Sequence, residues 1–227
     1  MKYEKIKKGK LIERENRFIA LVDVEGEVER VHVPNTGRCK EIFVPGATVI
    51  LNEPTGTKRK TRYSLVSAYK GDLLINIDSQ APNKIVKEAL ENKKIFKDIT
   101  LIHPEYTYGN SRFDFYFERG KEKAFMEVKG VTLEDNGLCM FPDAPTLRGV
   151  KHIEELIKAK GEGYGAYIMF LVQMEGMKAF VPNVKMHKEL GDALKDAMAA
   201  GVNVLVYDTL VMEGEVLFGR KVELMKW

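Results

Sequence analysis

SRFDFYFERGKEKAFMEVKGV, residues 111–131, predicts a hairpin of two antiparallel strands joined by a short turn. In its first half, RFDFYFE (112–118), aromatic and charged side chains alternate strictly, which is the period of a strand with two different faces. Its second half, KAFMEVKGV (123–131), is an apolar run that carries two opposite charges. The alternation predicts that one face of the first strand holds Phe113, Phe115 and Phe117.

The charged residues of the hairpin are the first candidates for a functional site. Glu127 and Lys129 lie two residues apart and therefore share a face of the second strand. Side chains that face each other across a hairpin approach to roughly 5 Å, so we expect Asp114 of the first strand to meet Glu127. The pattern alone leaves two interpretations open, which are a structural ion pair at a sheet edge and a metal site.

A metal site explains why two carboxylates would converge. Carboxylates at short range repel each other unless a divalent cation lies between them, and hard oxygen ligands suit Mg²⁺ or Mn²⁺. In that arrangement Lys129 would lie beside a metal-bound water, or stabilise charge that develops on a phosphate oxygen. The sequence therefore predicts Asp114, Glu127 and Lys129 as catalytic residues, with the two carboxylates as metal ligands.

The residues that flank the hairpin indicate a mixed α/β domain over residues 81–227. Apolar residues at helical spacing alternate with short apolar runs, and the order is α-β-β-β-α-β-α-β. The predicted helices cover residues 83–94, 146–160 and 184–200, and the predicted strands cover residues 99–108, 112–118, 123–131, 164–174 and 202–209.

The first 80 residues have a different pattern. About five short strand-like runs are separated by turn signals such as Glu25-Gly26 and Pro45-Gly46. This spacing predicts a small closed barrel of the oligonucleotide/oligosaccharide-binding (OB) type, a fold that often binds single-stranded nucleic acid. The stretch IDSQAPNK, residues 77–84, reads as the junction between residues 1–80 and 81–227.

The excess of positive over negative charge lies in the predicted barrel. Residues 1–80 hold 15 Lys and Arg against 11 Asp and Glu, while residues 81–227 hold 21 against 22. The loop TGTKRKTRY, residues 55–63, is either a solvated hairpin tip or a contact with nucleic-acid phosphates. Its candidate phosphate contacts are Lys58, Arg59, Lys60 and Arg62.

The composition is that of a soluble globular protein, with 44% hydrophobic and 30% charged residues among 227. No apolar run approaches the roughly 20 residues of a membrane helix, and the basic N-terminus lacks the apolar core of a secretory signal. The two cysteines are 100 positions apart and form no zinc-type pair. We therefore expect a cytoplasmic protein without a membrane partner.

The Asp and Glu-x-Lys pattern within an α-β-β-β-α-β core resembles the restriction-endonuclease-like nuclease superfamily. That resemblance implies a further acidic ligand on the preceding helix, for which Glu88 is the candidate, although its position on the flank of the apolar stripe favours a solvated helix glutamate. Four segments in combination also resemble the sugar fermentation stimulation protein A family, which implies an OB-type barrel, a nuclease-like domain and DNA binding. They are residues 31–51, 111–118, 126–134 and 141–156.

Four further side chains are candidate contacts to nucleic acid. Arg148 and His152 lie four residues apart on one helical face, where they would hold a phosphate or simply face water. Arg38 follows a turn in which Gly37 is expected to need positive φ, and Arg112 shares a strand face with Asp114.

These patterns predict a Mg²⁺- or Mn²⁺-dependent nuclease acting on DNA or RNA. The alternative is a DNA-binding regulator of sugar metabolism genes that keeps a nuclease fold without turnover. Alternating apolar runs near the C-terminus, residues 205–224, suggest an edge through which two copies could form a homodimer.

Overall fold

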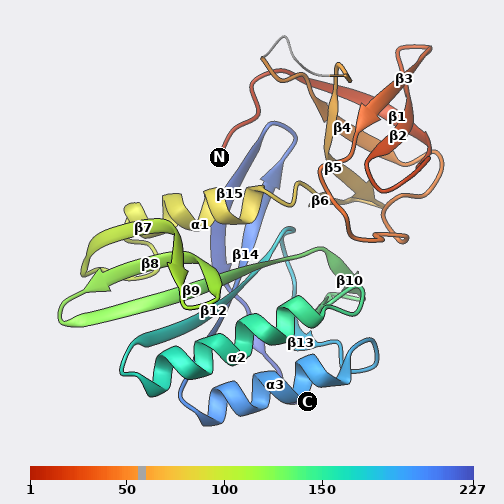
Figure 1. Cartoon of the computed structure of the whole chain (residues 1–227). Helices are drawn as coiled ribbons and strands as arrows, with labels where there is room; N and C mark the ends of the chain where they lie inside the picture. The colour runs from red at the N-terminus through yellow and green to blue at the C-terminus, as the bar shows by residue number, and fades with distance from the viewer. Residues whose placement is uncertain (56–59) are drawn as a thin grey trace.

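Six strands from the N-terminal part of the chain form one sheet that closes on itself (Figure 1). The computed structural model describes residues 1–55 and 60–227. Neighbouring strands are antiparallel in the order β3-β2-β1-β4-β5-β6, and a parallel bridge between His32 and Ser64 joins β3 to β5 and closes the barrel. The strands are β1 (Ile6–Glu13), β2 (Ile19–Val24), β3 (Glu27–His32), β4 (Thr48–Asn52), β5 (Ser64–Lys70) and β6 (Leu73–Asn76).

A second six-stranded sheet organises the rest of the chain, in the order β15-β14-β12-β9-β8-β7. Its central strand β12 is parallel to both β9 and β14, whereas the outer pairs are antiparallel. Every residue of β12 is buried, as expected for a parallel strand covered on both faces. The strands are β7 (Ile99–Tyr108), β8 (Ser111–Arg119), β9 (Glu122–Val131), β12 (Gly165–Val172), β14 (Asn203–Met212) and β15 (Glu215–Lys221).

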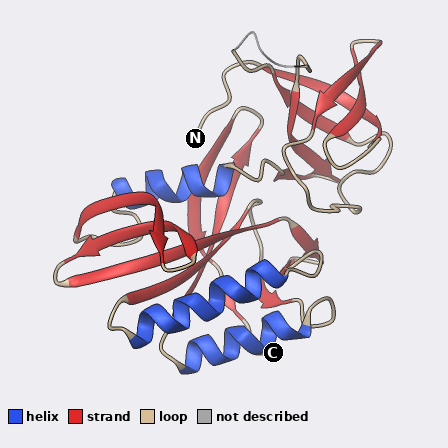
Figure 2. Ribbon diagram, in the orientation of Figure 1, coloured by secondary structure: helices blue, strands red, loops and turns tan. Residues whose placement is uncertain are grey.

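Three helices cover the two faces of this sheet (Figure 2). On one face, α1 (Ala81–Glu91) packs in a core with Phe115, Phe117 and Met126. On the other face, α2 (Leu147–Gly161) and α3 (Lys188–Ala199) share a core with Phe170. No helix in the described part of the chain is long and apolar enough to span a bilayer.

The barrel and the second domain are held together by a shared interior. Buried residues of the barrel, such as Val49 and Leu65, belong to the same apolar cluster as those under α2 and α3. The Gln173 side chain, just after β12, donates to the Asn76 side chain of β6 at 2.9 Å, and the Asn76 backbone N–H donates to the Gln173 carbonyl at 2.9 Å. These contacts fix the barrel against the end of the central strand.

The predicted fold class, an OB-type barrel followed by a mixed α/β domain, is confirmed, with corrections in detail. The predicted helix 184–200 begins only at Lys188, because the backbone N–H groups of Met186 and His187 bond to Asn183 in a turn. A small third sheet escaped prediction because its strands are short. Its members are β10 (Leu133–Asp135), β11 (Leu138–Phe141), β13 (Ala179–Pro182) and β16 (Glu223–Leu224).

The strict alternation predicted for residues 112–118 is also corrected. Phe115 and Phe117 pack on the α1 face, but Phe113 packs on the α2 face, where its ring lies 5.1 Å from that of Phe125. The register of β8 with β9 runs only as far as Phe115 opposite Met126. Beyond this point β8 pairs with β7 alone, which allows its backbone to turn relative to β9.

The C-terminal apolar runs form the antiparallel pair β14–β15, with β15 at the edge of the sheet. Part of that edge is covered by the N-terminal residues of the same chain, because Lys2 bridges to Glu215 and the Val216 N–H donates to the Met1 carbonyl. A homodimer through this edge stays a prediction.

Candidate metal and nucleic-acid site

Asp114 lies at the point where β8 and β9 separate. Its Oδ2 accepts a hydrogen bond from the backbone N–H of Val128 at 2.7 Å, so the carboxylate satisfies a strand donor beyond the end of the ladder. Its Oδ1 accepts from the side chain of Asn83 on α1, also at 2.7 Å. Burial and the nearby charge of Glu127 raise the pKa of the Asp114 carboxyl above its ordinary value.

Glu127, on β9, is only 3% exposed. Its Oε1 accepts from Lys129 Nζ at 2.6 Å and from His152 Nδ1. Burial alone would raise the pKa of this carboxyl, but the hydrogen bond from His152 and the charge and hydrogen bond of Lys129 outweigh burial and hold the pKa below its usual range. The second oxygen, Oε2, is buried and has no hydrogen-bond partner.

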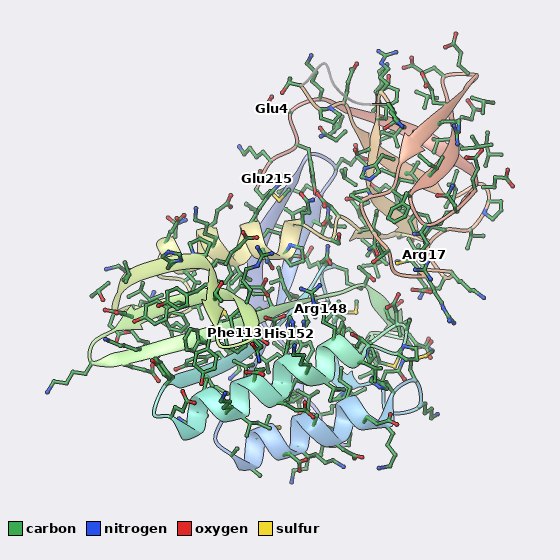
Figure 3. All side chains as sticks on the ribbon, viewed as in Figure 1. Glu4, Arg17, Phe113, Arg148, His152 and Glu215 are labelled. Carbon is green, nitrogen blue, oxygen red and sulfur yellow. The ribbon has the colours of Figure 1, made fainter. Side chains whose placement is uncertain are left out.

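Helix α2 brings His152 to this carboxylate. Thr146 begins the helix as its N-cap, with its side chain accepting from the Gly149 N–H at 3.1 Å. From the first turn of the helix, Arg148 Nε donates to His152 Nε2 at 3.3 Å, and Figure 3 shows both side chains on the side of α2 that faces the sheet. Because an arginine N–H can only donate, His152 Nε2 accepts and His152 Nδ1 carries the proton that is donated to Glu127.

The centre fits a divalent cation bound by few protein ligands. Asp114 on β8 and Glu127 on β9 lie close enough that the charge of Glu127 raises the pKa of Asp114, and the buried Oε2 of Glu127 lacks the partner that a buried polar atom requires. Across residues 1–55 and 60–227, no three His, Cys, Asp or Glu side chains are arranged to hold a metal ion. Mg²⁺ commonly uses one or two carboxylates and keeps several waters, so this donor set is sufficient for it.

Glu88, the predicted third ligand, is not part of the cluster. Its carboxylate is 51% exposed and pairs with the N-terminal amine of Met1 at 2.8 Å, next to β15. Asn83, almost one and a half turns earlier on α1, is the residue that reaches Asp114. The helix therefore contributes an amide donor to the centre in place of the expected acid, and the sequence prediction for Glu88 is corrected.

The remaining predicted phosphate contacts are spread over the surface. Arg62 pairs with Glu53 at 2.9 Å and covers the ring of Tyr63, while exposed Arg112 lies 3.6 Å from Glu105. Lys60 is exposed, and Lys58 and Arg59 lie outside the described residues. Binding of nucleic acid by these residues stays a prediction.

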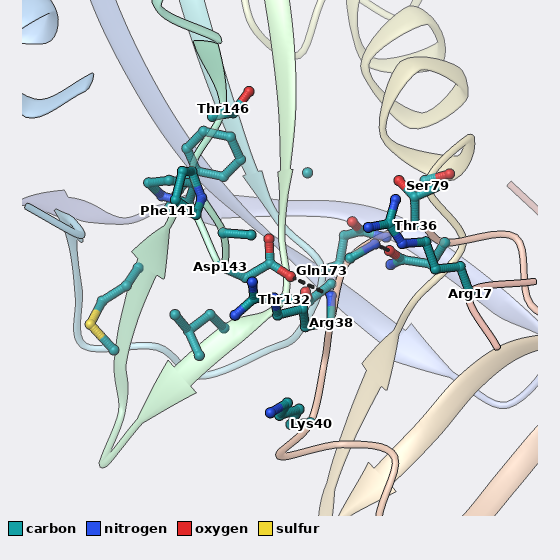
Figure 4. A pocket seen from close by; sticks show the side chains of 18 of the residues that line it. Arg17, Thr36, Arg38, Lys40, Ser79, Thr132, Phe141, Asp143, Thr146 and Gln173 are labelled. Atoms are coloured by element: carbon teal, nitrogen blue, oxygen red, sulfur yellow. Dashed lines mark hydrogen bonds between the residues drawn. The ribbon is translucent and has the colours of Figure 1, made fainter. Parts of the chain in front are cut away.

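Arg38 belongs to a feature that the sequence did not reveal, a pocket of about 700 Å³ between the barrel and the second domain (Figure 4). The backbone N–H of Arg38 donates to Asp143 Oδ2 at 3.0 Å across this boundary. Gly37 is needed here for space, not for positive φ as predicted, because a Cβ on it would lie 2.7 Å from Asp143 Oδ2. Asn35 stabilises the turn as expected, since its Oδ1 accepts from the Gly37 N–H at 2.7 Å.

Arg14 shapes the barrel side of the pocket. Its guanidinium lies over the ring of Phe43, 4.5 Å from the centroid, and joins the loop after β1 to the loop after β3. The bonds run to backbone carbonyls of both loops, at 2.7 to 3.2 Å, and no sequence motif marks such partners. The acceptors are the carbonyls of Asn16, Arg17, Asn35, Gly37 and Arg38.

Two family models match consecutive parts of the chain. Residues 12–77 match the SfsA N-terminal OB domain, and residues 80–215 match the Sugar fermentation stimulation protein RE domain. The sugar fermentation stimulation protein homolog of Clostridium beijerinckii is 54% identical over 216 residues, which cover 95% of this chain and 96% of that protein. The homolog of Ruminiclostridium cellulolyticum is 52% identical over 223 residues, which cover 98% and 99% respectively.

Among solved structures, that of Pyrococcus furiosus SfsA in complex with Ca²⁺ is similar over its full length. The TM-score is 0.91 at 28% sequence identity, with 100% of this chain and 98% of that chain covered. The relative's structure thus contains a divalent cation on the same fold.

Proposed function

This chain belongs to the sugar fermentation stimulation protein family, and we propose from that membership and the site geometry that it is a divalent-metal-dependent nuclease acting on DNA. The observation that carries the proposal is the pair Asp114 and Glu127, with a buried Glu127 oxygen that has no partner in the protein. The Ca²⁺ in the structure of the Pyrococcus furiosus relative supports a cation for this fold. Mg²⁺ and Mn²⁺ are the ions proposed for this chain, with RNA as a second possible substrate.

In this function Asp114 and Glu127 would hold the ion, which would polarise a phosphate oxygen and lower the pKa of a bound water. His152 and Lys129 keep Glu127 ionised and oriented, because both donate to its Oε1. Lys129 adds a positive charge next to the carboxylates, where negative charge on a phosphate would be stabilised. Asn83 orients Asp114 from α1.

The test is cleavage of labelled single-stranded DNA, double-stranded DNA and RNA with Mg²⁺, with Mn²⁺ or with EDTA. We expect metal-dependent cleavage that is lost in Asp114→Ala and Lys129→Ala. Glu88→Gln is the matched control, because it also removes an acid predicted as a ligand but one that the structure places beside Met1. Cleavage in Asp114→Ala equal to that of the unmodified protein would overturn the assignment.

A second candidate, DNA binding without turnover, is favoured by the small ligand set. The described residues offer two carboxylates, and one oxygen of Glu127 is already occupied by Lys129 and His152. Such a protein would act as a regulator of sugar metabolism genes, as the family name suggests. Binding of DNA without product in any metal would favour this candidate.

A further inference from the structure

The pocket between the two domains is lined by residues of the same segments that carry the candidate centre. Gly130, which follows Lys129 on β9, lines it, and a Cβ at this position would lie 2.4 Å from Gln173 Oε1. Thr146, the N-cap of α2, also lines it, so the positive end of the helix dipole faces this region. Pocket and centre are therefore neighbours along both β9 and α2.

The charge of the pocket is positive. Four cationic residues line it against one carboxylate, Asp143, whose Oδ2 is engaged by the Arg38 backbone N–H. The side chains of Arg17, Arg38 and Lys40 are exposed and form no ion pair with the residues that the structure describes. Cations that are brought together without counter-ions favour an anionic ligand, and guanidinium groups suit phosphate in particular.

The opposite wall is partly apolar. Leu133, Met140 and Phe141, from β10 and β11, line the pocket and are half-buried. A positive wall that faces an aromatic and aliphatic wall is the arrangement in which proteins hold the phosphate and the base of an unpaired nucleotide. The volume of about 700 Å³ lies within the roughly 300–1,000 Å³ of pockets for one compact ligand.

Hydrogen bonds fix the loop that forms the barrel side of the pocket and join the barrel to the second domain. Asn35 Nδ2 donates to the Ile77 carbonyl at 2.8 Å, and the Ser79 hydroxyl donates to the Pro34 carbonyl at 2.7 Å. Gln173 and Asn76 are joined as described above. With the walls fixed, a space of this size accepts a nucleotide or two of one strand and excludes a double helix.

We propose that this pocket binds one or two unpaired nucleotides of the substrate strand, with phosphate on Arg17, Arg38 and Lys40 and base against Phe141. The inference rests on the proposed nuclease function and specifies its substrate class, which is single-stranded nucleic acid or a frayed end. Intact duplex would have to open before one of its strands entered.

The test measures binding by the full-length protein in EDTA, so that no cleavage occurs, with a short fluorescent single strand and the same strand in a duplex. We expect tighter binding of the single strand. Arg17→Gln with Arg38→Gln should weaken it at least about tenfold, and should lower the slope of log affinity against log salt by about 1.4, since each phosphate contact to a single strand contributes roughly 0.7. Lys121→Gln with Lys123→Gln, on the distant β8–β9 turn, is the charge-matched control.

A second variant tests shape without a change in charge. Ala144→Phe would fill the pocket, and we expect it to abolish single-strand binding while the melting temperature is retained. Competition by a 5′-phosphorylated dinucleotide, but not by deoxyribose 5-phosphate, would support a nucleotide ligand. Equal competition by the sugar phosphate would overturn that ligand class.

The outcomes separate this inference from the proposed function. Duplex binding that equals single-strand binding and is insensitive to folded Ala144→Phe overturns the inference, even if metal-dependent cleavage is observed. Pocket-dependent single-strand binding without cleavage in Mg²⁺ or Mn²⁺ upholds the inference and overturns the nuclease.

Discussion

Asp114 accepts hydrogen bonds from two neutral donors, the Asn83 side chain on α1 and the Val128 backbone. Glu127, on the neighbouring strand, accepts from Lys129 and from His152 on α2. The pKa of the first carboxyl is raised and that of the second is lowered. Glu127 is thus kept ionised by the protein itself, whereas ionised Asp114 lacks a positive partner of its own and stands to gain most from a cation.

The largest expected effect is the loss of stability when the charge of Glu127 is removed. Glu127→Gln leaves Lys129 and His152 without the buried anion to which they donate, and breaking a buried ion pair on one side costs about 3 kcal/mol or more. Denaturant unfolding in EDTA should show this loss. Asp114→Asn, which keeps an acceptor for Val128, should cause no loss of stability at neutral pH, and an equal loss for the two variants would contradict the asymmetry.

A divalent metal should stabilise the protein through Asp114. At a metal concentration 100 times the dissociation constant, the expected gain in unfolding free energy is about 2.7 kcal/mol. Melting curves with and without Mn²⁺ would measure it. Asp114→Asn should lose the gain and Glu88→Gln should keep it, whereas a gain that persists in Asp114→Asn would place the ion elsewhere.

The two supporting side chains should differ in importance. His152→Ala removes one of two donors to a nearly inaccessible anion, so we expect a loss of about 2 kcal/mol. Asn83→Ala removes a donor from Asp114, which keeps the Val128 N–H, and should cost about 1 kcal/mol. Free energies of unfolding measured in EDTA would rank the two variants. A larger loss for Asn83→Ala than for His152→Ala would contradict the expected order.

The smallest expected effect is the dependence of stability on pH. The raised pKa of Asp114 means that its contribution to stability is present in acid and is lost as pH rises through that pKa. The lowered pKa of Glu127 gives the opposite sign, since its contribution is present above the ordinary glutamate range and is lost as pH falls. In EDTA at neutral pH, Asp114→Asn should therefore be slightly more stable than the unmodified protein, and this difference should vanish on acidification.

The sequence predicted contacts correctly where they depend on residues close together in the chain. A spacing of two residues was enough to place Glu127 and Lys129 together, at 2.6 Å between Oε1 and Nζ, because it depends only on the geometry of one strand. The break in alternation at Phe113 was not visible, since it arises where β8 leaves β9 and continues with β7 alone.

The features that the sequence did not predict depend on how elements far apart in the chain pack against each other. Periodicity places Glu88 on a flank of α1 but does not say whether that flank faces β8 or β15, and the structure places it beside β15. Asn83 and Gln173 gain their roles only once α1 and the barrel are docked on the sheet. For the same reason the pocket has residues from both domains and no contiguous motif.

The five hydrogen bonds of Arg14 determine how this residue can act on a ligand in the pocket. A guanidinium carries five N–H donors, and here each of them is used by a backbone carbonyl. Arg14 therefore has no donor left for a ligand, although it lines the pocket. Arg14 would act on a bound anion through its field alone, whereas the exposed side chains of Arg17, Arg38 and Lys40 are available for direct contact.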